Sequence, residues 1–399
     1  MPVWFQDTWP LLVLAVLPWL TYWDLLWDGG WVSDDCVFSG PEAKPISLYE
    51  GVLQQPLSWH TLFKVFRYHY GRVPNPDRAW KEKKLPPFTA SSRAHHRLNL
   101  VLASGCLVLL YSLLSRIFTP QIAFLTTILF AVHPLGCQTI GWVSGVGYIT
   151  GTFFMLLGLN LVFLIQDAHW MTTPLGVLGG LLLYAFCQWM AVEAWFGTIG
   201  AVAILLWLGA YPFAIVAALF AIVQCLHTLR EALSLRRKTF KDQQMAQSTY
   251  FYPKKLIVVL KTLYYNVKLA WFPKRMGLYH PFCYHYELPY VEWEDRYCWL
   301  GVSTLALLTS GVFWGPPPVS LGCLWLMSFM VLFLNWITAN QFVVDRYVWL
   351  PSVGACLIAA TYLPAWAYGL VLGVALMRTW SHLYTYRNEF YFYHSNLMN

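Results

Sequence analysis

The chain has 399 residues, of which 58% are hydrophobic and only 11% are charged. Soluble domains carry about one quarter charged residues, so this composition excludes an ordinary water-soluble exterior and favours a surface that faces lipid. The formal net charge of +7 is modest and spread along the chain, which gives no support to nucleic-acid binding. The composition therefore predicts an integral membrane protein built as one bundle.

The first apolar segment runs from about Trp9 to Trp27. It has no basic region before it and no small-residue cleavage site, so we expect a retained anchor rather than a signal peptide. Further predicted spans cover about Leu98–Leu114, Gln121–Val132, Tyr148–Ile165, Leu175–Met190, Ala194–Leu208, Pro212–Leu226, Tyr297–Phe313, Val319–Trp336, Tyr347–Leu363 and Ala365–Ala375. We therefore predict an all-α bundle of about 11 transmembrane helices, forming a single polytopic domain over residues 1–399.

Two polar blocks interrupt the apolar segments. Residues 28–97 form a predicted extramembrane loop, because their Lys, Arg and Glu content cannot lie in hydrocarbon. Residues 227–296 form a second extramembrane or interfacial segment. Within it, Leu256–Phe272 is apolar but interrupted by polar residues, which predicts an interfacial or re-entrant helix rather than a span. The interrupting residues are Lys261, Asn266 and Lys268.

The number of crossings places both polar blocks on one face of the membrane. The positive-inside rule would assign this face to the cytoplasm, but long loops are much less bound by that rule. The charges alone therefore leave the side of the membrane open.

Two adjacent carboxylates, Asp34 and Asp35, follow the first span closely. If they are partly buried, their repulsion raises the pKa of one of them unless a cation answers it, which would suit a general base, a metal ligand or both. If they are hydrated, they belong to a solvated loop or a helix cap. Both interpretations stay open, and the first would bring a divalent metal, Mg or Mn, to this pair.

Basic residues recur on the face of the polar blocks. They are Arg93, Arg97, Lys254, Lys255, Lys274, Arg275 and Arg346. Lys and Arg at a membrane interface suit the phosphate of a lipid-linked group, and they equally suit simple anchoring to lipid headgroups. Arg346 differs from the others because it adjoins Asp345 between two predicted spans, where ionic residues are functional candidates.

Two further polar residues stand beside apolar runs. Glu193 lies between two predicted spans and must find a partner or lie at the interface, so functional and structural interpretations both remain open. His133 precedes Pro134, a natural stop signal for a helix, and is more typical of a satisfied helix-end residue than of a ligand.

Several segments, in order along nearly the whole chain, resemble the membrane part of the GT-C glycosyltransferases. The resemblance is to the protein O-mannosyltransferases that carry tetratricopeptide repeats and to their bacterial relatives. The segments are Asp34-Asp35, His95 to Leu110, Leu129 to Pro134, Trp271-Phe272-Pro273-Lys274, Asp345 to Gly354, and the tail around Arg378 and Arg387-Asn388. The segment DRYVWLPSVG is close to the family pattern E-R-Y-x-Y-L-P-S-x-G.

The resemblance implies an inverting transfer of a sugar from a polyprenyl-phosphate donor to a hydroxyl of a protein or lipid acceptor. In that mechanism Asp34 or Asp35 is the base, in some members with a divalent metal. Lys274, Arg275 and Arg346 stabilise the departing phosphate. Glu193, His133, His95 and His96 are candidates for lining the site. The resemblance also implies a multi-pass protein of a bacterial inner membrane or the endoplasmic reticulum, with its charged loops on the non-cytoplasmic face.

The chain departs from the family pattern at several positions. The family's first-loop Arg-Pro, the second His and Thr-Glu after His-Pro, and the Gly-Arg-Ala-Asp segment are replaced. Their replacements are Leu85 to Phe88, Gly136 to Thr139, and Gly145 to Tyr148. The repeats are missing. The alternative hypothesis is therefore a catalytically inactive GT-C-like protein that serves as a structural or assembly subunit of a larger membrane complex.

Overall fold

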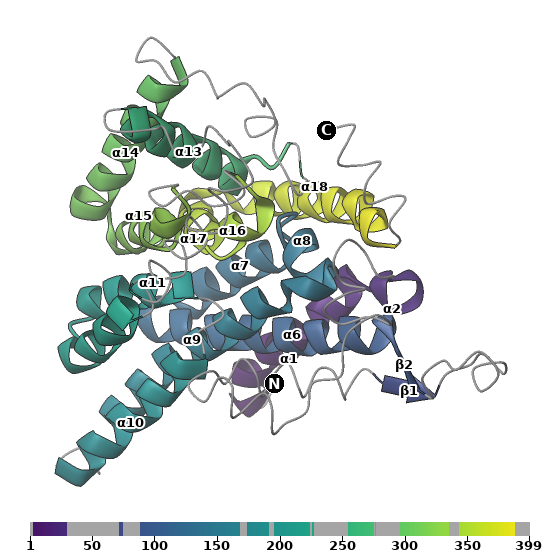
Figure 1. Cartoon of the computed structure of the whole chain (residues 1–399), viewed down its shortest axis with the longest axis horizontal. Helices are drawn as coiled ribbons and strands as arrows, with labels where there is room; N and C mark the ends of the chain where they lie inside the picture. Colours follow the sequence, from purple (N-terminus) through teal and green to yellow (C-terminus); the bar gives the residue numbers. More distant parts are fainter. Residues whose placement is uncertain are drawn as a thin grey trace, which may run out of the picture.

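The computed structural model describes residues 3–29, 72–74, 88–167, 174–190, 195–223, 226, 254–274, 276, 296–334 and 343–387. Its elements are α1 (Val3–Thr21), α2 (Leu25–Asp28), β1 (Arg72–Pro74), β2 (Phe88–Ala90), α6 (Ser92–Ile117), α7 (Pro120–Ala131), α8 (Gly136–Gly141), η1 (Val143–Gly145), α9 (Val146–Asp167), α10 (Pro174–Met190), α11 (Trp195–Trp207), α13 (Lys254–Trp271), α14 (Arg296–Trp314), α15 (Pro317–Met330), η6 (Val331–Phe333), α16 (Asp345–Trp349), α17 (Ser352–Tyr362), α18 (Ala365–Leu383) and η7 (Tyr384–Tyr386). A further apolar helix covers Tyr211–Val223. The two short strands pair antiparallel, and the rest of this architecture is helical (Figure 1).

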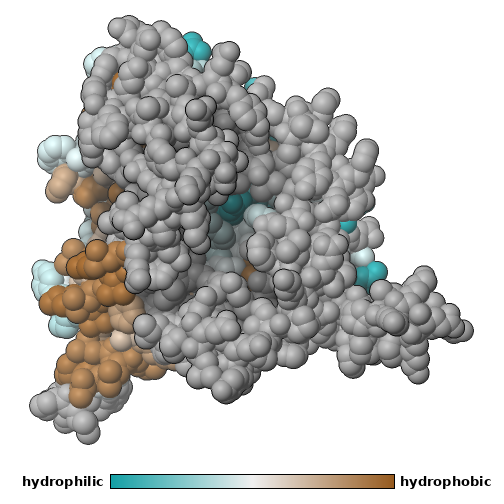
Figure 2. All heavy atoms as spheres, viewed as in Figure 1, coloured by the Kyte–Doolittle hydropathy of each residue, from teal (hydrophilic) through white to brown (hydrophobic). Residues whose placement is uncertain are grey.

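Three of the described helices are long and apolar enough to cross a membrane. They are Ser92–Ile117, Val146–Gln166 and Arg296–Trp314. Seven shorter apolar helices accompany them. The predicted helical class is confirmed, and these three helices are consistent with a membrane protein. Hydrophobic residues also gather on the edge of the molecule where Figure 1 draws α10 and α11, as expected of a surface in contact with lipid (Figure 2).

Local signals explain where the central helices begin. Ser91 caps α6 by accepting a hydrogen bond from the Ala94 N–H at 3.4 Å. Thr119 caps α7 in the same way through the Ile122 N–H, and Pro120 occupies the first turn, where its missing N–H costs nothing. With this cap, α7 covers Pro120–Ala131, and each end lies within one residue of the predicted Gln121–Val132.

Two predicted spans are divided in the structure. The segment Trp9–Trp27 contains the end of α1 at Thr21, a turn, and the short helix α2. The segment Tyr347–Leu363 is split into α16 and α17 around Leu350 and Pro351. Proline has no N–H to donate, so the ladder of helical hydrogen bonds is interrupted there. Hydropathy alone does not register either break.

Helix α13 was expected to be interfacial or re-entrant. It is one continuous helix that runs antiparallel to α14, because Tyr297 contacts the rings of Tyr264 and Tyr265 while Gly301 lies against the backbone of Leu260. No re-entrant turn occurs within Lys254–Trp271. Lys261 and Asn266 are buried, whereas Lys268 is exposed.

Several helices end together, which gives the bundle a distinct polar end. Near the end of α18, Thr379 donates to the Val132 carbonyl just after α7 at 2.9 Å, and Trp380 donates to the Thr21 carbonyl at the end of α1 at 3.0 Å. His133 contacts the Ala270 carbonyl at the end of α13 at 3.1 Å. We use "polar end" for the region formed by the ends of α1, α7, α13 and α18, the start of α6, and the short helices α8 and α16.

Candidate functional site at the polar end

The short helix α8 is the structural centre of the polar end, and all of its residues are buried. Asn99 of α6 fixes its last turn by donating to the carbonyls of Ile140 at 3.1 Å and Trp142 at 3.3 Å. On its other side, the amide oxygen of Gln138 accepts a hydrogen bond from the backbone N–H of Arg346 at 2.8 Å. The helix α8 thereby connects α6 to α16.

Arg346 is surrounded by aromatic rings. Its guanidinium carbon lies 5.1 Å from the ring centroid of Trp142, 5.9 Å from that of Tyr148 and 5.1 Å from that of Tyr347. The ring of Phe333 stacks on the ring of Tyr347, with 4.2 Å between the two ring centroids. Aromatic faces attract a cation and hold a planar guanidinium in one orientation. The charge of Arg346 is therefore fixed in position by the aromatic residues around it.

The space-filling view shows where this region meets the surface. Hydrophilic residues are visible in the middle of the face, near the place where Figure 1 draws α16 (Figure 2). Arg346 itself is partly exposed, whereas its neighbour Asp345 is only 1% exposed. A fixed and partly exposed cation can meet an anionic group of a ligand.

Asp345 places a carboxylate inside this region. It acts electrostatically on His133 and Cys137, which lie four residues apart, and on His382 near the end of α18. A buried carboxylate is costly unless neighbouring groups stabilise it. Polar side chains around α8 therefore lie directly beside residues of the apolar core, such as Leu135 and Ile140.

His133 has contacts at both ring nitrogens. Nε2 contacts the Ala270 carbonyl at 3.1 Å, and Nδ1 accepts from the Leu135 N–H at 3.4 Å. A neutral ring with its proton on Nε2 matches these two contacts. Burial lowers the pKa of His133 to about 4, and the hydrogen bond to Ala270 and the charge of Asp345 offset only part of that effect. The ring therefore links α7 to α13 as an uncharged group.

Several buried polar atoms around α8 have no hydrogen-bond partner among the described residues. They are the hydroxyl oxygens of Tyr22 and Thr139, the amide nitrogen of Gln138 and Nε2 of His382. Buried polar groups are normally paired with protein or water. This spare hydrogen-bonding capacity favours water or a ligand that carries several hydroxyl groups.

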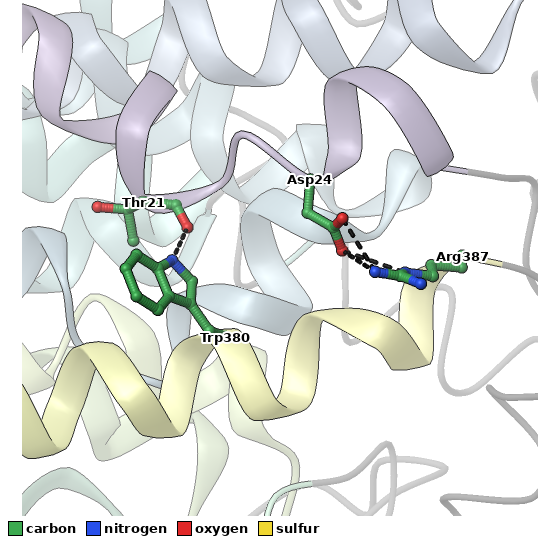
Figure 3. Close-up of polar contacts among 4 residues, drawn as sticks. All are labelled: Thr21, Asp24, Trp380 and Arg387. Atoms are coloured by element: carbon green, nitrogen blue, oxygen red, sulfur yellow. Dashed lines mark hydrogen bonds and ion pairs between the residues drawn. The ribbon is translucent and has the colours of Figure 1, made fainter.

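The root of the first loop is fixed against the same end. Arg387 binds both carboxylate oxygens of Asp24, at 3.0 to 3.1 Å, and Trp380 binds Thr21 (Figure 3). Ser92 donates to the Gly29 carbonyl at 2.9 Å, and the ring of His96 lies so close to Gly29 that a side chain at this position would overlap it. The loop that carries Asp34 and Asp35 therefore leaves the bundle from a held position.

The sequence-predicted site residues fall into two groups. Asp34, Asp35, Glu193 and Arg275 lie outside the described residues. Among the others, His133 and Arg346 meet around Asp345 and α8. His95 and His96 are buried in the first turn of α6 at the root of the loop. Lys274 is exposed just after α13, and its carbonyl accepts a hydrogen bond from Arg378.

Sequence reasoning missed the aromatic residues around Arg346 and the role of Gln138. Trp142 and Tyr148 lie about 200 positions before Arg346 in the chain, and no local pattern connects them. Gln138 was noted only as a departure from the family pattern. The one available signal was the polar Gln138-Thr139 pair inside an otherwise apolar stretch.

Among the residues that the structure describes, no group of three or more His, Cys, Asp or Glu side chains could hold a metal ion. Asp34 and Asp35 are not among those residues, so a divalent metal at that pair stays a prediction.

No family model, no curated protein and no solved structure matches the chain. The resemblance to the GT-C glycosyltransferases therefore stays a hypothesis carried by the residues quoted for it.

Proposed function

We propose that this chain is an inverting membrane glycosyltransferase of the GT-C type, which moves a sugar from a polyprenyl-phosphate donor to an acceptor hydroxyl of a protein or lipid. The observation that carries the proposal is the position of Arg346. Its cation lies among three aromatic rings and is partly exposed. The root of the Asp34-Asp35 loop is fixed at the same end of the bundle.

The proposed chemistry assigns one step to each group. Asp34 or Asp35 removes the proton from the acceptor hydroxyl as its oxygen attacks the anomeric carbon. The bond between that carbon and the phosphate oxygen breaks on the opposite face, so the configuration inverts. Negative charge grows on the departing polyprenyl phosphate, and Arg346, Lys274 and Arg275 stabilise it. A phosphate leaves readily, so this mechanism needs no strong general acid.

The carboxylates of Asp34 and Asp35 are oxygen ligands of the kind that Mg or Mn prefers. A divalent ion bound there would increase the acidity of the acceptor hydroxyl.

The proposal includes a topology. About 11 crossings form the bundle, with the polar end on the non-cytoplasmic side of a bacterial inner membrane or of the endoplasmic reticulum. A lipid-linked donor then reaches the site from within the bilayer, while the acceptor arrives from the aqueous side. Membrane lipids and the donor are the expected partners.

The direct test is a transfer assay with the purified full chain, polyprenyl-phosphate sugars and candidate protein and lipid acceptors. We expect transfer by the unmutated protein and a loss of about 100-fold or more in Asp34→Asn or Asp35→Asn, the size typical of a lost general base. Arg116→Gln, at the opposite end of α6, is the control and should transfer normally.

The second candidate is an inactive structural or assembly subunit of a larger membrane complex. It is favoured by α8, where Gly136 to Thr139 are buried and neutral at positions that carry His and Thr-Glu in the family. If the unmutated protein transfers nothing from any donor and co-purifies in stoichiometric amount with other membrane proteins, this second candidate replaces the first.

A further inference from the structure

The junction between α13 and α18 brings two cations together at the polar end. After α13 ends at Trp271, the chain continues through Phe272 and Pro273 to Lys274. Arg378 of α18 donates a hydrogen bond from its guanidinium to the Lys274 carbonyl. The two positively charged side chains therefore belong to neighbouring residues in space, and both residues are exposed.

The charges at this junction are not neutralised by the described part of the chain. Among the described residues, neither Lys274 nor Arg378 forms an ion pair with a carboxylate. A described acidic residue of the polar end, Asp345, is buried and acts electrostatically on His133, Cys137 and His382. The contact with Lys274 uses one nitrogen of the Arg378 guanidinium, which carries five N–H donors in total. Two exposed cationic residues that contact each other through the Lys274 backbone attract an anion, and phosphate suits their charge and donors.

An apolar surface adjoins the cations. Trp271 is 37% exposed and Phe272 is 72% exposed, directly before Lys274 in the chain. Aromatic residues are common at the level of lipid headgroups, where one side of the residue meets hydrocarbon and the other meets water. A ligand that matches both features has a phosphate joined to a hydrocarbon chain.

We propose that Lys274 and Arg378 bind the phosphate of a membrane-embedded phosphate ester, while Trp271 and Phe272 contact the hydrocarbon next to that phosphate. Sequence reasoning gave Lys274 a role in phosphate binding but gave none to Arg378. The identity of the lipid rests on the proposed function, under which it is the polyprenyl phosphate of the donor. The same chemistry is present in the headgroup of phosphatidic acid, and the experiment separates these two sources.

The test is native mass spectrometry of the purified full chain with polyprenyl phosphate, phosphatidic acid, or polyprenol, which lacks the phosphate. We expect Lys274→Gln and Arg378→Gln each to weaken the binding of polyprenyl phosphate about tenfold or more, as for the loss of a charged hydrogen bond. Polyprenol binding should not change. Arg116→Gln, an exposed arginine at the opposite end of α6, is the matched control and should bind as the unmutated protein does.

Lys274→Gln keeps the backbone carbonyl that Arg378 contacts, so its effect reports on charge even if Arg378→Gln disturbs the junction. A loss for polyprenyl phosphate alone supports a site for the donor, and an equal loss for phosphatidic acid supports a general site for lipid phosphate. Unchanged binding of both phosphate lipids by both variants overturns the site. The readout needs no transfer, so a protein that binds phosphate lipids through these residues but transfers no sugar would contradict only the proposed function.

Discussion

Arg346 shows how a single charge is placed among helix ends. The rings of Trp142, Tyr148 and Tyr347 lie 5.1 to 5.9 Å from its guanidinium, and its backbone N–H is held by Gln138. Lysine carries the same charge but cannot stack as a plane or form a forked pair of hydrogen bonds. The aromatic surroundings therefore select arginine at this position.

His133 gives a prediction about pH at the residue scale. Its pKa of about 4 in the folded chain lies below the ordinary value of 6.5. The neutral ring therefore stabilises the fold fully above pH 6.5, and this contribution is lost as the pH falls from 6.5 through 4. We expect the free energy of unfolding in detergent to fall by about 2 kcal/mol more between pH 7 and pH 5 in the unmutated protein than in His133→Gln. Equal pH dependence in the two proteins would show that His133 does not titrate in this way.

Gly136 gives a prediction about packing. A methyl group added at this position would overlap the hydroxyl of Tyr22, which is fully buried. Gly136→Ala should therefore lower the free energy of unfolding by about 1–3 kcal/mol, measured by denaturation in detergent. Gly369→Ala is the matched control, because nothing lies within 4 Å of the added methyl group in α18. That control should be neutral or stabilising by up to about 1 kcal/mol; a similar loss in both variants contradicts the contact.

At the scale of elements, the end of α18 holds the turn between α1 and α2. Arg387 binds Asp24 through both carboxylate oxygens, and Trp380 binds the Thr21 carbonyl, so residues more than 350 positions apart are joined (Figure 3). Asp34 lies five residues beyond Gly29, within about 18 Å of it even in a fully extended chain. The contacts of α18 therefore limit where the acidic pair can lie.

Charge reversal tests this link. Arg387→Asp should increase amide hydrogen exchange over residues 22–29 and cost about 0.5–1 kcal/mol of stability, since the pair is partly exposed to water. Asp24→Arg combined with Arg387→Asp should restore much of the protection. Arg97→Asp, an exposed arginine of the same end, serves as the control. A double variant that is as unprotected as Arg387→Asp alone would show that the ion pair does not hold the turn.

The sequence predicted helices better than it predicted their ends and junctions. Apolar stretches located α7, α9 and α14 closely, because hydropathy reports directly on long buried or lipid-facing helices. It could not locate α8, which has six residues and no charge. The aromatic contacts of Arg346 depend on the tertiary fold, and the pairing of Asp24 with Arg387 joins opposite ends of the chain.

At the scale of the whole molecule, described cations lie at both ends of the long helices. Arg93, Arg97, Lys274, Arg346, Arg378 and Arg387 belong to the polar end, whereas Arg116 lies at the other end of α6 and Lys254 and Lys255 begin α13, away from the polar end. Helix α6 has 26 residues, so its length of about 39 Å exceeds the hydrocarbon core of a bilayer. Its two ends are therefore expected on opposite sides of the membrane.

Cysteine labelling tests this orientation. We expect Arg93→Cys to react with a membrane-impermeant maleimide added from the non-cytoplasmic side of sealed vesicles, and Arg116→Cys to react only from the cytoplasmic side. Six cysteines of the described chain are buried, and labelling of the unmutated protein gives the background. Labelling of both positions from the same side contradicts a spanning α6, and reversed labelling contradicts the proposed side of the polar end.

The most direct test of a donor site around Arg346 is the initial rate of sugar transfer over a range of polyprenyl-phosphate sugar concentrations, for Arg346→Lys and Arg116→Lys. Both changes remove a guanidinium that lies over an aromatic ring. The Arg346 guanidinium is 5.1 Å from the Trp142 ring centroid, and the Arg116 guanidinium, at the opposite end of α6, is 5.8 Å from the Phe163 ring centroid. We predict that kcat/KM for the donor falls about 10- to 100-fold in Arg346→Lys, equivalent to about 1.4–2.8 kcal/mol, and stays unchanged in Arg116→Lys. Equal rates in the two variants, or no transfer by the unmutated protein, would contradict the account.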